Sequence, residues 1–204
     1  MIISPARLDG VFRITPQIWP DDRGQFSETY RSDSLPSLGM PDAFVQDNVS
    51  HSKRGVLRGL HFQNPKAQAK FLTVLSGEIY DVVVDLRPHS VTFGQWEGFP
   101  LNGEALHQIF VPAGFAHGFC VLSKETLISY KCAEFYDPRC QHTLAWDDPQ
   151  LGIKWPIENP ILSSKDRRGA LFSELKAQLF SSDTSLLSSG LGKRSRLRSH
   201  YNAH

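Results

Sequence analysis

The sequence predicts an all-β protein, a barrel or sandwich of short strands with little helix, and three observations support this. Short segments rich in β-branched and aromatic residues are separated by Gly, Pro, Asn and Ser, which is the spacing of all-β barrels. Ser76-Gly77-Glu78 separates two β-rich runs and is typical of a hairpin turn. Leucines at four-residue spacing, indicating an amphipathic helix, occur between Arg168 and Phe180.

The N-terminal third predicts edge strands joined by turns. Residues 8–19 mix β-branched and aromatic residues around a proline, as edge strands do. Asp21-Asp22-Arg23-Gly24 has the residues of a turn, and we expect a strand over 25–30 with alternate side chains on one face. Two prolines and one glycine predict a short helical turn or loop at 35–42, and another strand follows at 44–50.

The remaining chain continues this pattern until the helix. Strands are expected on both sides of the hairpin at residues 71–75 and 79–86, and then at 92–99, 108–111, 119–122 and 126–135, followed by a loop at 147–156. Residues 181–192 are rich in Ser and Gly, and residues 193–198 contain four basic side chains. We therefore expect one domain at residues 1–180 and a disordered or weakly ordered tail at 181–204.

Composition excludes several classes of function. Lys and Arg total 22 and Asp and Glu total 21, so no overall charge attracts nucleic acid or an anionic membrane. No apolar run reaches the roughly 20 residues of a membrane span, and the N-terminus lacks the pattern of a signal peptide. The three cysteines lack metal-site spacing and suit reduced thiols. We expect a cytoplasmic protein.

Two motifs resemble the paired signatures of the cupins, which are small jelly-roll barrels with an internal pocket. The first spans residues 54–77 and contains His61, and the second is Pro112-Ala113-Gly114-Phe115-Ala116-His117. In a metal-binding cupin the first motif also supplies a second His and a Glu, but this chain has Gln63 and Lys70 in the nearest places. An ammonium group has no lone pair to donate to a metal. We expect a barrel without metal or other cofactor that uses organic acid–base chemistry.

From about residue 5 to 172 the chain is similar to the dTDP-4-dehydrorhamnose 3,5-epimerases. Eight stretches match in order: DDRGQFSE (21–28), QDNVSHS (46–52), RGVLRGLHFQ (54–63), DVVVDLR (81–87), VPAGFAHGF (111–119), YKCAEFYDP (130–138), WDDP (146–149) and SSKD (163–166). The resemblance implies a cupin-type jelly roll, a homodimer whose N-terminal residues complete the partner's pocket, and a role in deoxysugar and polysaccharide biosynthesis. The implied substrate is dTDP-4-keto-6-deoxyglucose.

The reaction explains which residue types it needs. A C4 ketone acidifies the protons on C3 and C5, so epimerisation requires a base, a proton donor on the opposite face and a group that stabilises the enolate oxygen. The resemblance implies His61 as base, Asp166 as its partner and Tyr130 as donor, and we expect Lys70 to stabilise the oxyanion. His117 is expected to orient the sugar.

The nucleotide and its pyrophosphate require cationic, polar and aromatic contacts. Guanidinium groups bind phosphates in a bidentate manner, and Arg23 and Arg58 match family positions of that kind. The other expected binding residues are Phe26, Glu28, Gln46, Asn48, Tyr136, Gln141 and Lys165. Gln141 departs from the family pattern, which often has Glu there, so the identity of the nucleotide is less firmly implied than the chemistry.

Three alternatives stay open at this point. One is a relative that inverts only C3 or only C5, because the sequence does not show how the sugar ring turns in the pocket. Another is a metal-dependent cupin dioxygenase or isomerase, against which Gln63 and Lys70 argue. The last is a non-catalytic sugar-binding barrel, which would have no need of the base, acid and cation.

Overall fold

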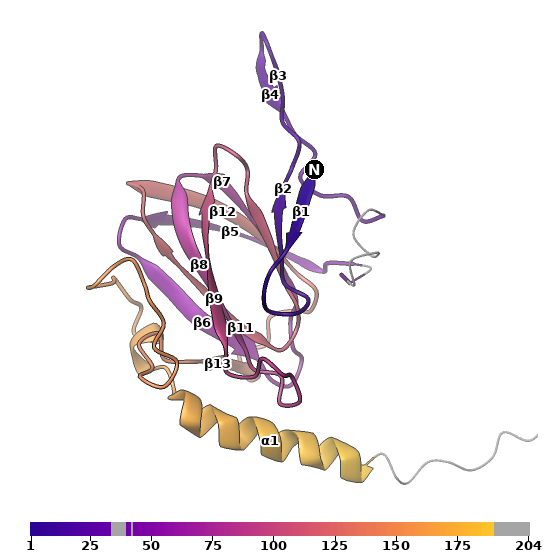
Figure 1. Ribbon diagram of the computed structural model, residues 1–204, viewed down its shortest axis with the longest axis vertical. Helices are drawn as coiled ribbons and strands as arrows, with labels where there is room; N and C mark the ends of the chain where they lie inside the picture. Colours follow the sequence, from indigo (N-terminus) through magenta and orange to yellow (C-terminus); the bar gives the residue numbers. More distant parts are fainter. Residues whose placement is uncertain (34–39, 42, 190–204) are drawn as a thin grey trace, which may run out of the picture.

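The computed structural model describes residues 1–33, 40–41 and 43–189, with side chains described as far as residue 180. Two antiparallel sheets form the barrel and a separate hairpin extends from it (Figure 1). The larger sheet has the strand order β1-β2-β10-β7-β12-β5, formed by Ile2–Pro5, Phe12–Thr15, Gln108–Val111, Lys70–Ser76, Glu125–Cys132 and Gln46–Lys53. The smaller has the order β13-β6-β11-β8-β9, formed by Gln141–Thr143, Leu57–Gln63, Phe115–Val121, Glu78–Asp85 and Trp96–Asn102.

The core lies between the two sheets, which confirms the predicted all-β jelly-roll class. Side chains from both sheets form one cluster, which includes Leu72 and Ile128 from the larger sheet and Val83, Leu101 and Phe119 from the smaller. Strands β8 and β11 are buried along nearly their whole length because the smaller sheet is covered on its outer face as well. A second cluster there includes Leu60 and Val84 together with Phe172, Leu175 and Leu179.

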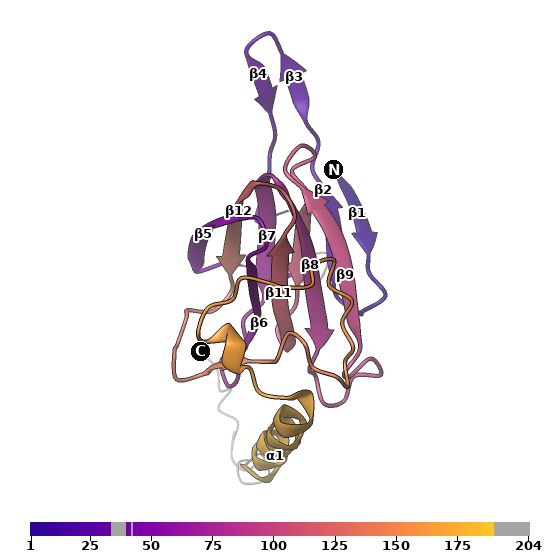
Figure 2. The ribbon, with the colours of Figure 1, turned by 90° about the vertical axis from the view of Figure 1, so that its left-hand side faces the viewer.

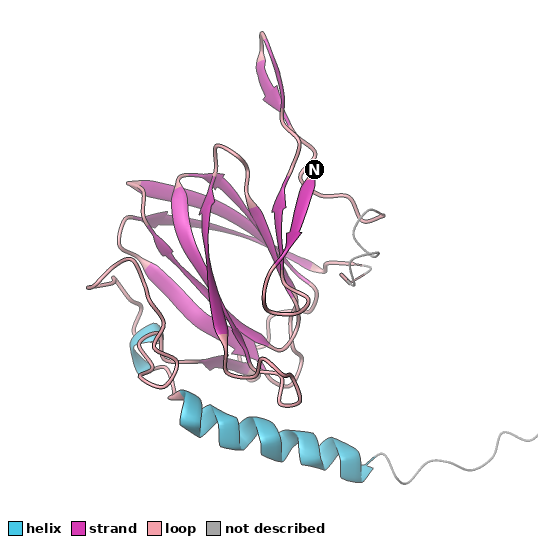
Figure 3. Cartoon of the chain, viewed as in Figure 1, coloured by secondary structure: helices cyan, strands magenta, loops and turns pink. Residues whose placement is uncertain are grey.

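A helix covers one end of the barrel, and it starts and ends later than the sequence pattern predicts. Helix α1 runs over Phe172–Ser189, and the short 3-10 helix η2 covers Asp166–Arg168 (Figure 3). Between them Ala170 pairs with Leu144, so residues just before 172 are extended. The buried carboxylate of Asp148 accepts the backbone N–H of Phe172 at 2.7 Å and fixes where α1 begins. Residues 181–189, which the sequence pattern assigns to the tail, continue α1, and residues 190–204 lie outside the described residues.

The hairpin of β3 (Trp19–Asp21) and β4 (Gly24–Phe26) extends from the end of the barrel opposite α1 (Figure 2). The predicted strand over 25–30 is therefore wrong beyond Phe26, and the expected common face of Phe26, Glu28 and Tyr30 does not form. Tyr30 instead packs edge-on against the rings of Phe44 and Phe71, so the chain leaves the hairpin to return to the barrel.

Smaller departures have local causes. The strand expected at 92–99 begins at Trp96, because the hydroxyls of Ser90 and Thr92 donate to the buried Asp85 carboxylate and hold a turn there. The strand expected at 119–122 begins earlier, at Phe115. Most of the expected loop or helical turn at 35–42 lies outside the described residues. Among the described residues, no helix is long and apolar enough to cross a bilayer.

Candidate active site

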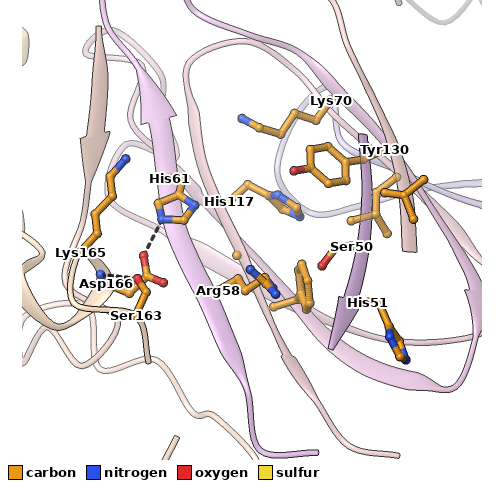
Figure 4. A pocket seen from close by; sticks show the side chains of 14 residues that line it. Ser50, His51, Arg58, His61, Lys70, His117, Tyr130, Ser163, Lys165 and Asp166 are labelled. Atoms are coloured by element: carbon orange, nitrogen blue, oxygen red, sulfur yellow. Dashed lines mark hydrogen bonds and ion pairs between the residues drawn. The ribbon is translucent and has the colours of Figure 1, made fainter. Parts of the chain in front are cut away.

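A cavity of about 490 Å³ opens between the two sheets, and all four predicted catalytic residues line it (Figure 4). Its walls come from β5, β6, β7, β11, β12, the start of η2 and the segment before it. The lining residues are Val49, Ser50, His51, Arg58, His61, Lys70, Leu72, His117, Gly118, Phe119, Tyr130, Ser163, Lys165 and Asp166. Residues more than 100 positions apart in the chain, such as His61 and Asp166, therefore line one cavity.

His61 and Asp166 form a hydrogen-bonded pair on one side of this cavity. The Nε2 atom of His61 lies 2.6 Å from Oδ1 of Asp166, whose side chain is almost completely buried. Burial alone would raise the pKa of Asp166, but hydrogen bonds and the charges of His61 and Lys165 outweigh it and lower that pKa. The carboxylate is therefore ionised and accepts the Nε2 proton. The other ring nitrogen is left with a lone pair, as a general base requires.

A β-bulge allows both Arg58 and His61 to line the cavity. Residues three apart in a regular strand point to opposite faces. Here His61 pairs with His117 but Arg58 pairs with Phe119, so β6 contains one residue more than β11 across this interval. The extra residue turns Arg58 back toward the cavity. Gly59 and Gly118 make the close approach possible, because a Cβ on Gly59 would lie 2.6 Å from the Cα of Gly118.

Tyr130 and Lys70 face this pair from the larger sheet. Tyr130 lies opposite Leu72 and Cys132 lies opposite Lys70, so all four side chains share the sheet face that lines the cavity. Burial raises the pKa of Tyr130 and Cys132 adds to this effect, while Arg58 opposes it. The phenol stays protonated at neutral pH. Burial lowers the pKa of Lys70, which makes its ammonium group a better proton donor than an exposed lysine.

His117 belongs to a second histidine–carboxylate pair that the sequence analysis did not identify. Its Nε2 lies 2.8 Å from Oδ2 of Asp81, and both side chains are buried. His117 also lies directly across from His61 on the neighbouring strand. A single acidic residue within the apolar run from Ile79 to Val84 was the available signal, since a buried carboxylate in a strand needs a partner.

A second cavity of about 290 Å³ adjoins the first and contains the predicted nucleotide-contacting residues of the barrel. Its lining includes Gln46, Asn48, Tyr136 and Gln141, and it shares His61, Lys70 and Tyr130 with the first cavity. The Nε2 of Gln46 donates to Oδ1 of Asn48 at 3.0 Å. The Oε1 atom of Gln141 is buried without a hydrogen-bond partner. Lys165 lies in the first cavity beside Asp166.

The three remaining predicted binding residues do not line either cavity of this chain. Arg23 and Phe26 belong to the extending hairpin, and Glu28 follows it. The Arg23 guanidinium is 90% exposed and pairs with Asp21, and Phe26 is 68% exposed beside Trp19. The arginine and the aromatic ring expected to contact the nucleotide thus lie on a hairpin outside the barrel of their own chain.

The residues around His61 do not form a cupin metal site. Within the described part of the chain, no three His, Cys, Asp or Glu side chains lie close enough together to hold a metal ion. The Gln63 amide, at the position of the second cupin histidine, is hydrogen-bonded to the main chain through both its nitrogen and its oxygen.

Comparisons with known proteins agree with this geometry. Residues 5–174 match the family model described as dTDP-4-dehydrorhamnose 3,5-epimerase. A dTDP-4-dehydrorhamnose 3,5-epimerase of Methanothermobacter thermautotrophicus is 49% identical over 163 residues, which cover 78% of this chain and 88% of that protein. This chain belongs to the dTDP-4-dehydrorhamnose 3,5-epimerase family.

Two further members of the epimerase family bear on the substrate. The crystal structure of a 3,5-epimerase from Legionella pneumophila, in complex with dTDP-4-keto-L-rhamnose, is 44% identical with a TM-score of 0.84 and covers 87% of this chain and 96% of its own. A Streptomyces niveus protein, named as a dTDP-4-dehydrorhamnose 3-epimerase, is 39% identical over 178 residues, 86% of either chain. Both double and single epimerases are therefore among the relatives of this family member.

Proposed function

We propose that this chain inverts C3 and C5 of dTDP-4-keto-6-deoxyglucose through enolate intermediates and produces dTDP-4-dehydrorhamnose. The observation that carries the proposal is the arrangement of base and acid. His61, with its ionised partner Asp166, lies on one sheet and the protonated Tyr130 lies on the other, across a single cavity. Removing a proton from one face of a carbon and returning one to the opposite face needs that arrangement.

Each step has a residue suited to it. His61 removes the proton next to the C4 ketone, and Asp166 stabilises the imidazolium that forms. Lys70 donates a hydrogen bond to O4 as negative charge develops there, an interaction that a buried ammonium makes strongly. Tyr130 then delivers a proton from the other side. His117, held by Asp81, orients the sugar hydroxyls. The proposed reaction uses no metal or other cofactor.

The nucleotide occupies the second cavity and the rim of the first. Arg58 and Lys165 are placed for the pyrophosphate, and the amides of Gln46, Asn48 and Gln141 are placed for polar groups of the nucleoside. Tyr136 offers a half-exposed ring for the base. The neutral amide of Gln141 preserves hydrogen bonding to a thymine-like base without the charge of a glutamate.

The hairpin residues complete the pocket of a second copy. Arg23 and Phe26 have the chemistry of phosphate and base contacts, and they belong to the β3–β4 hairpin, which extends away from its own barrel (Figure 1). We propose a homodimer in which each hairpin covers the partner's cavity. Mixing a His61→Asn variant with an Arg23→Ala, Phe26→Ala variant should restore activity to one site per heterodimer. A mixture with no restored activity would contradict the exchange of hairpins.

Residues 1–180 form the catalytic domain, and the tail at 181–204 takes no part in the reaction. The enzyme works in the cytoplasm.

The deciding experiment is incubation with dTDP-4-keto-6-deoxyglucose in heavy water in metal-free buffer, followed by NMR at sugar positions 3 and 5. Deuterium at both positions is the expected result. Deuterium at one position would select the single-position epimerase, which the 3-epimerase relative keeps as the second candidate. No exchange at either position would refute enolate chemistry on this substrate. His61→Asn should lower turnover by several orders of magnitude.

A further inference from the structure

The segment from Glu134 to Asp137, between β12 and β13, has no regular secondary structure, yet side chains hold its backbone at every residue. Gln68 donates to the carbonyl of Glu134 at 2.6 Å, and Gln46 accepts the N–H of Tyr136 at 2.8 Å. Gln63 binds both Phe135 and Asp137. Three glutamines thus replace the strand pairing that this segment lacks.

Gln63 makes the largest contribution to this arrangement. Its Nε2 donates to the carbonyls of Lys66 at 2.9 Å and Phe135 at 3.2 Å, and its Oε1 accepts the N–H of Asp137 at 2.7 Å. Only 4% of the residue is exposed, so these bonds compete little with water. A side chain with one acceptor and two donor hydrogens is needed here, and of the natural amides glutamine has the length found at this place.

The far end of the segment is held as firmly. The Asp137 carboxylate accepts hydrogen bonds from the Lys66 ammonium at 2.9 Å and from the Arg139 guanidinium at 2.9 and 3.0 Å. Lys66 belongs to the loop after β6 whose carbonyl Gln63 also binds, so the two loops form one hydrogen-bonded unit. The backbone of the segment from Glu134 to Asp137 therefore has little freedom to move.

This fixed segment carries exposed aromatic side chains. Phe135 is 62% exposed and Tyr136 is 50% exposed, and Tyr136 lines the second cavity. Because the backbone that carries the Tyr136 ring is already fixed, little loop ordering remains to oppose the binding of a flat ligand. Gln63 lies two residues from His61 on the same face of β6. Strand β6 therefore carries the catalytic base His61 and, through Gln63, also holds the backbone on either side of Tyr136.

We propose that Gln63 is a positioning residue that sets the position of Tyr136 relative to the catalytic base His61. A nucleobase bound at Tyr136 is then held at the distance that brings the sugar carbons to His61. This inference rests on the proposed function. Gln63 itself borders the second cavity, but its amide nitrogen donates to two main-chain carbonyls and its oxygen accepts a main-chain N–H, so we assign it no hydrogen bond to the substrate. Its effect passes through the backbone of residues 135–137 to the Tyr136 ring.

The test uses two substitutions of Gln63 in the full chain. Gln63→Met keeps the volume and removes all three hydrogen bonds, and Gln63→Glu keeps the shape but places a carboxylate against two carbonyl oxygens. We expect Gln63→Met to weaken dTDP binding by about tenfold in calorimetry and to raise KM similarly, while kcat falls less than threefold. Gln63→Glu should weaken binding at least as much. Ile14→Val, a buried substitution outside both cavities and outside the cluster between the two sheets, controls for lost stability and should leave Kd and KM unchanged.

A double variant separates positioning from general weakening of the site. If Gln63 acts through the ring, Gln63→Met should add little to the loss of dTDP affinity already caused by Tyr136→Ala. The inference is overturned if the losses of dTDP affinity in the two single variants add fully in the double variant, or if Gln63→Met leaves Kd and KM unchanged. In either case an active wild-type enzyme would still support the proposed function. Wild-type protein that neither binds dTDP nor turns over the sugar overturns both.

Discussion

Replacing Asp166 by Asn tests the catalytic pair with the smallest change in shape. The substitution removes the charge that stabilises the His61 imidazolium, and the amide can also present its N–H to Nε2, which would place the proton on the nitrogen facing the substrate. The 2.6 Å contact and the near-complete burial of Asp166 leave no water to compensate. In comparable pairs the loss is about 10³–10⁴-fold in kcat, or about 4–5.5 kcal/mol in the barrier. Deuterium incorporation at C3 and C5 and steady-state kcat would both fall by this factor.

The matched control is Asp148→Asn. Asp148 is also buried, but it accepts the backbone N–H of Phe172 at the start of α1 and those of Gln150 and Leu151, and it lines neither cavity. The control variant should lose thermal stability and keep its kcat per folded molecule. If Asp166→Asn kept more than about a tenth of the wild-type kcat, or if Asp148→Asn lost as much activity, the pairing of His61 with Asp166 would not be the source of basicity.

Three further predictions follow from the same structure. Burial lowers the folded-state pKa of Lys70, so its charge opposes folding below that pKa, and the opposition fades as pH rises through it toward the unfolded value of about 10.4. Lys70→Met should therefore raise the melting temperature, by a margin that shrinks at alkaline pH, and lower kcat about 10²–10³-fold; a lower melting temperature at neutral pH would contradict this. Tyr130→Phe spares proton abstraction, so we expect it to lower the rate of completed epimerisation more than the rate of deuterium exchange. Equal loss of both rates would contradict the role of Tyr130 as proton donor. Gly59→Ala places a methyl group 2.6 Å from the Cα of Gly118 at a φ of 127°, so we expect a loss of several kcal/mol in the free energy of unfolding, visible in urea titration, and an unchanged midpoint would show that the bulge tolerates a side chain.

Much of the fold could be predicted because its signals are local. Short β-rich runs and the turn at Gly77 predict strands, and the leucines at 171, 175 and 179 predict a helix near its observed place. The errors occurred where distant side chains decide the ends of elements. Asp148 fixes the start of α1 from 24 residues away, and Tyr30 leaves the hairpin because the rings of Phe44 and Phe71 bind it. Neither contact has a trace in the local sequence.

The site could be predicted only as a set of residue types with an order in the chain. His61, Tyr130 and Asp166 were named from motifs, but that His61 and Tyr130 face each other from different sheets is a property of the barrel. The spacing of Arg58 and His61 predicts opposite faces, and the bulge reverses this. Asp81 was missed because its partner His117 is 36 residues away, on the neighbouring strand.

The separation of base and acid between two sheets makes the gap between His61 and Tyr130 a mechanical property of the whole sandwich. Packed sheets lie about 10 Å apart, at a spacing set by the side chains between them. Leu72, Val83 and Ile128 belong to that packing. A substitution that adds or removes a methyl group in this packing therefore changes the distance across which the proton is transferred. Stability and rate thus depend on the same buried residues, and a repacked core of greater stability can still be a slower catalyst.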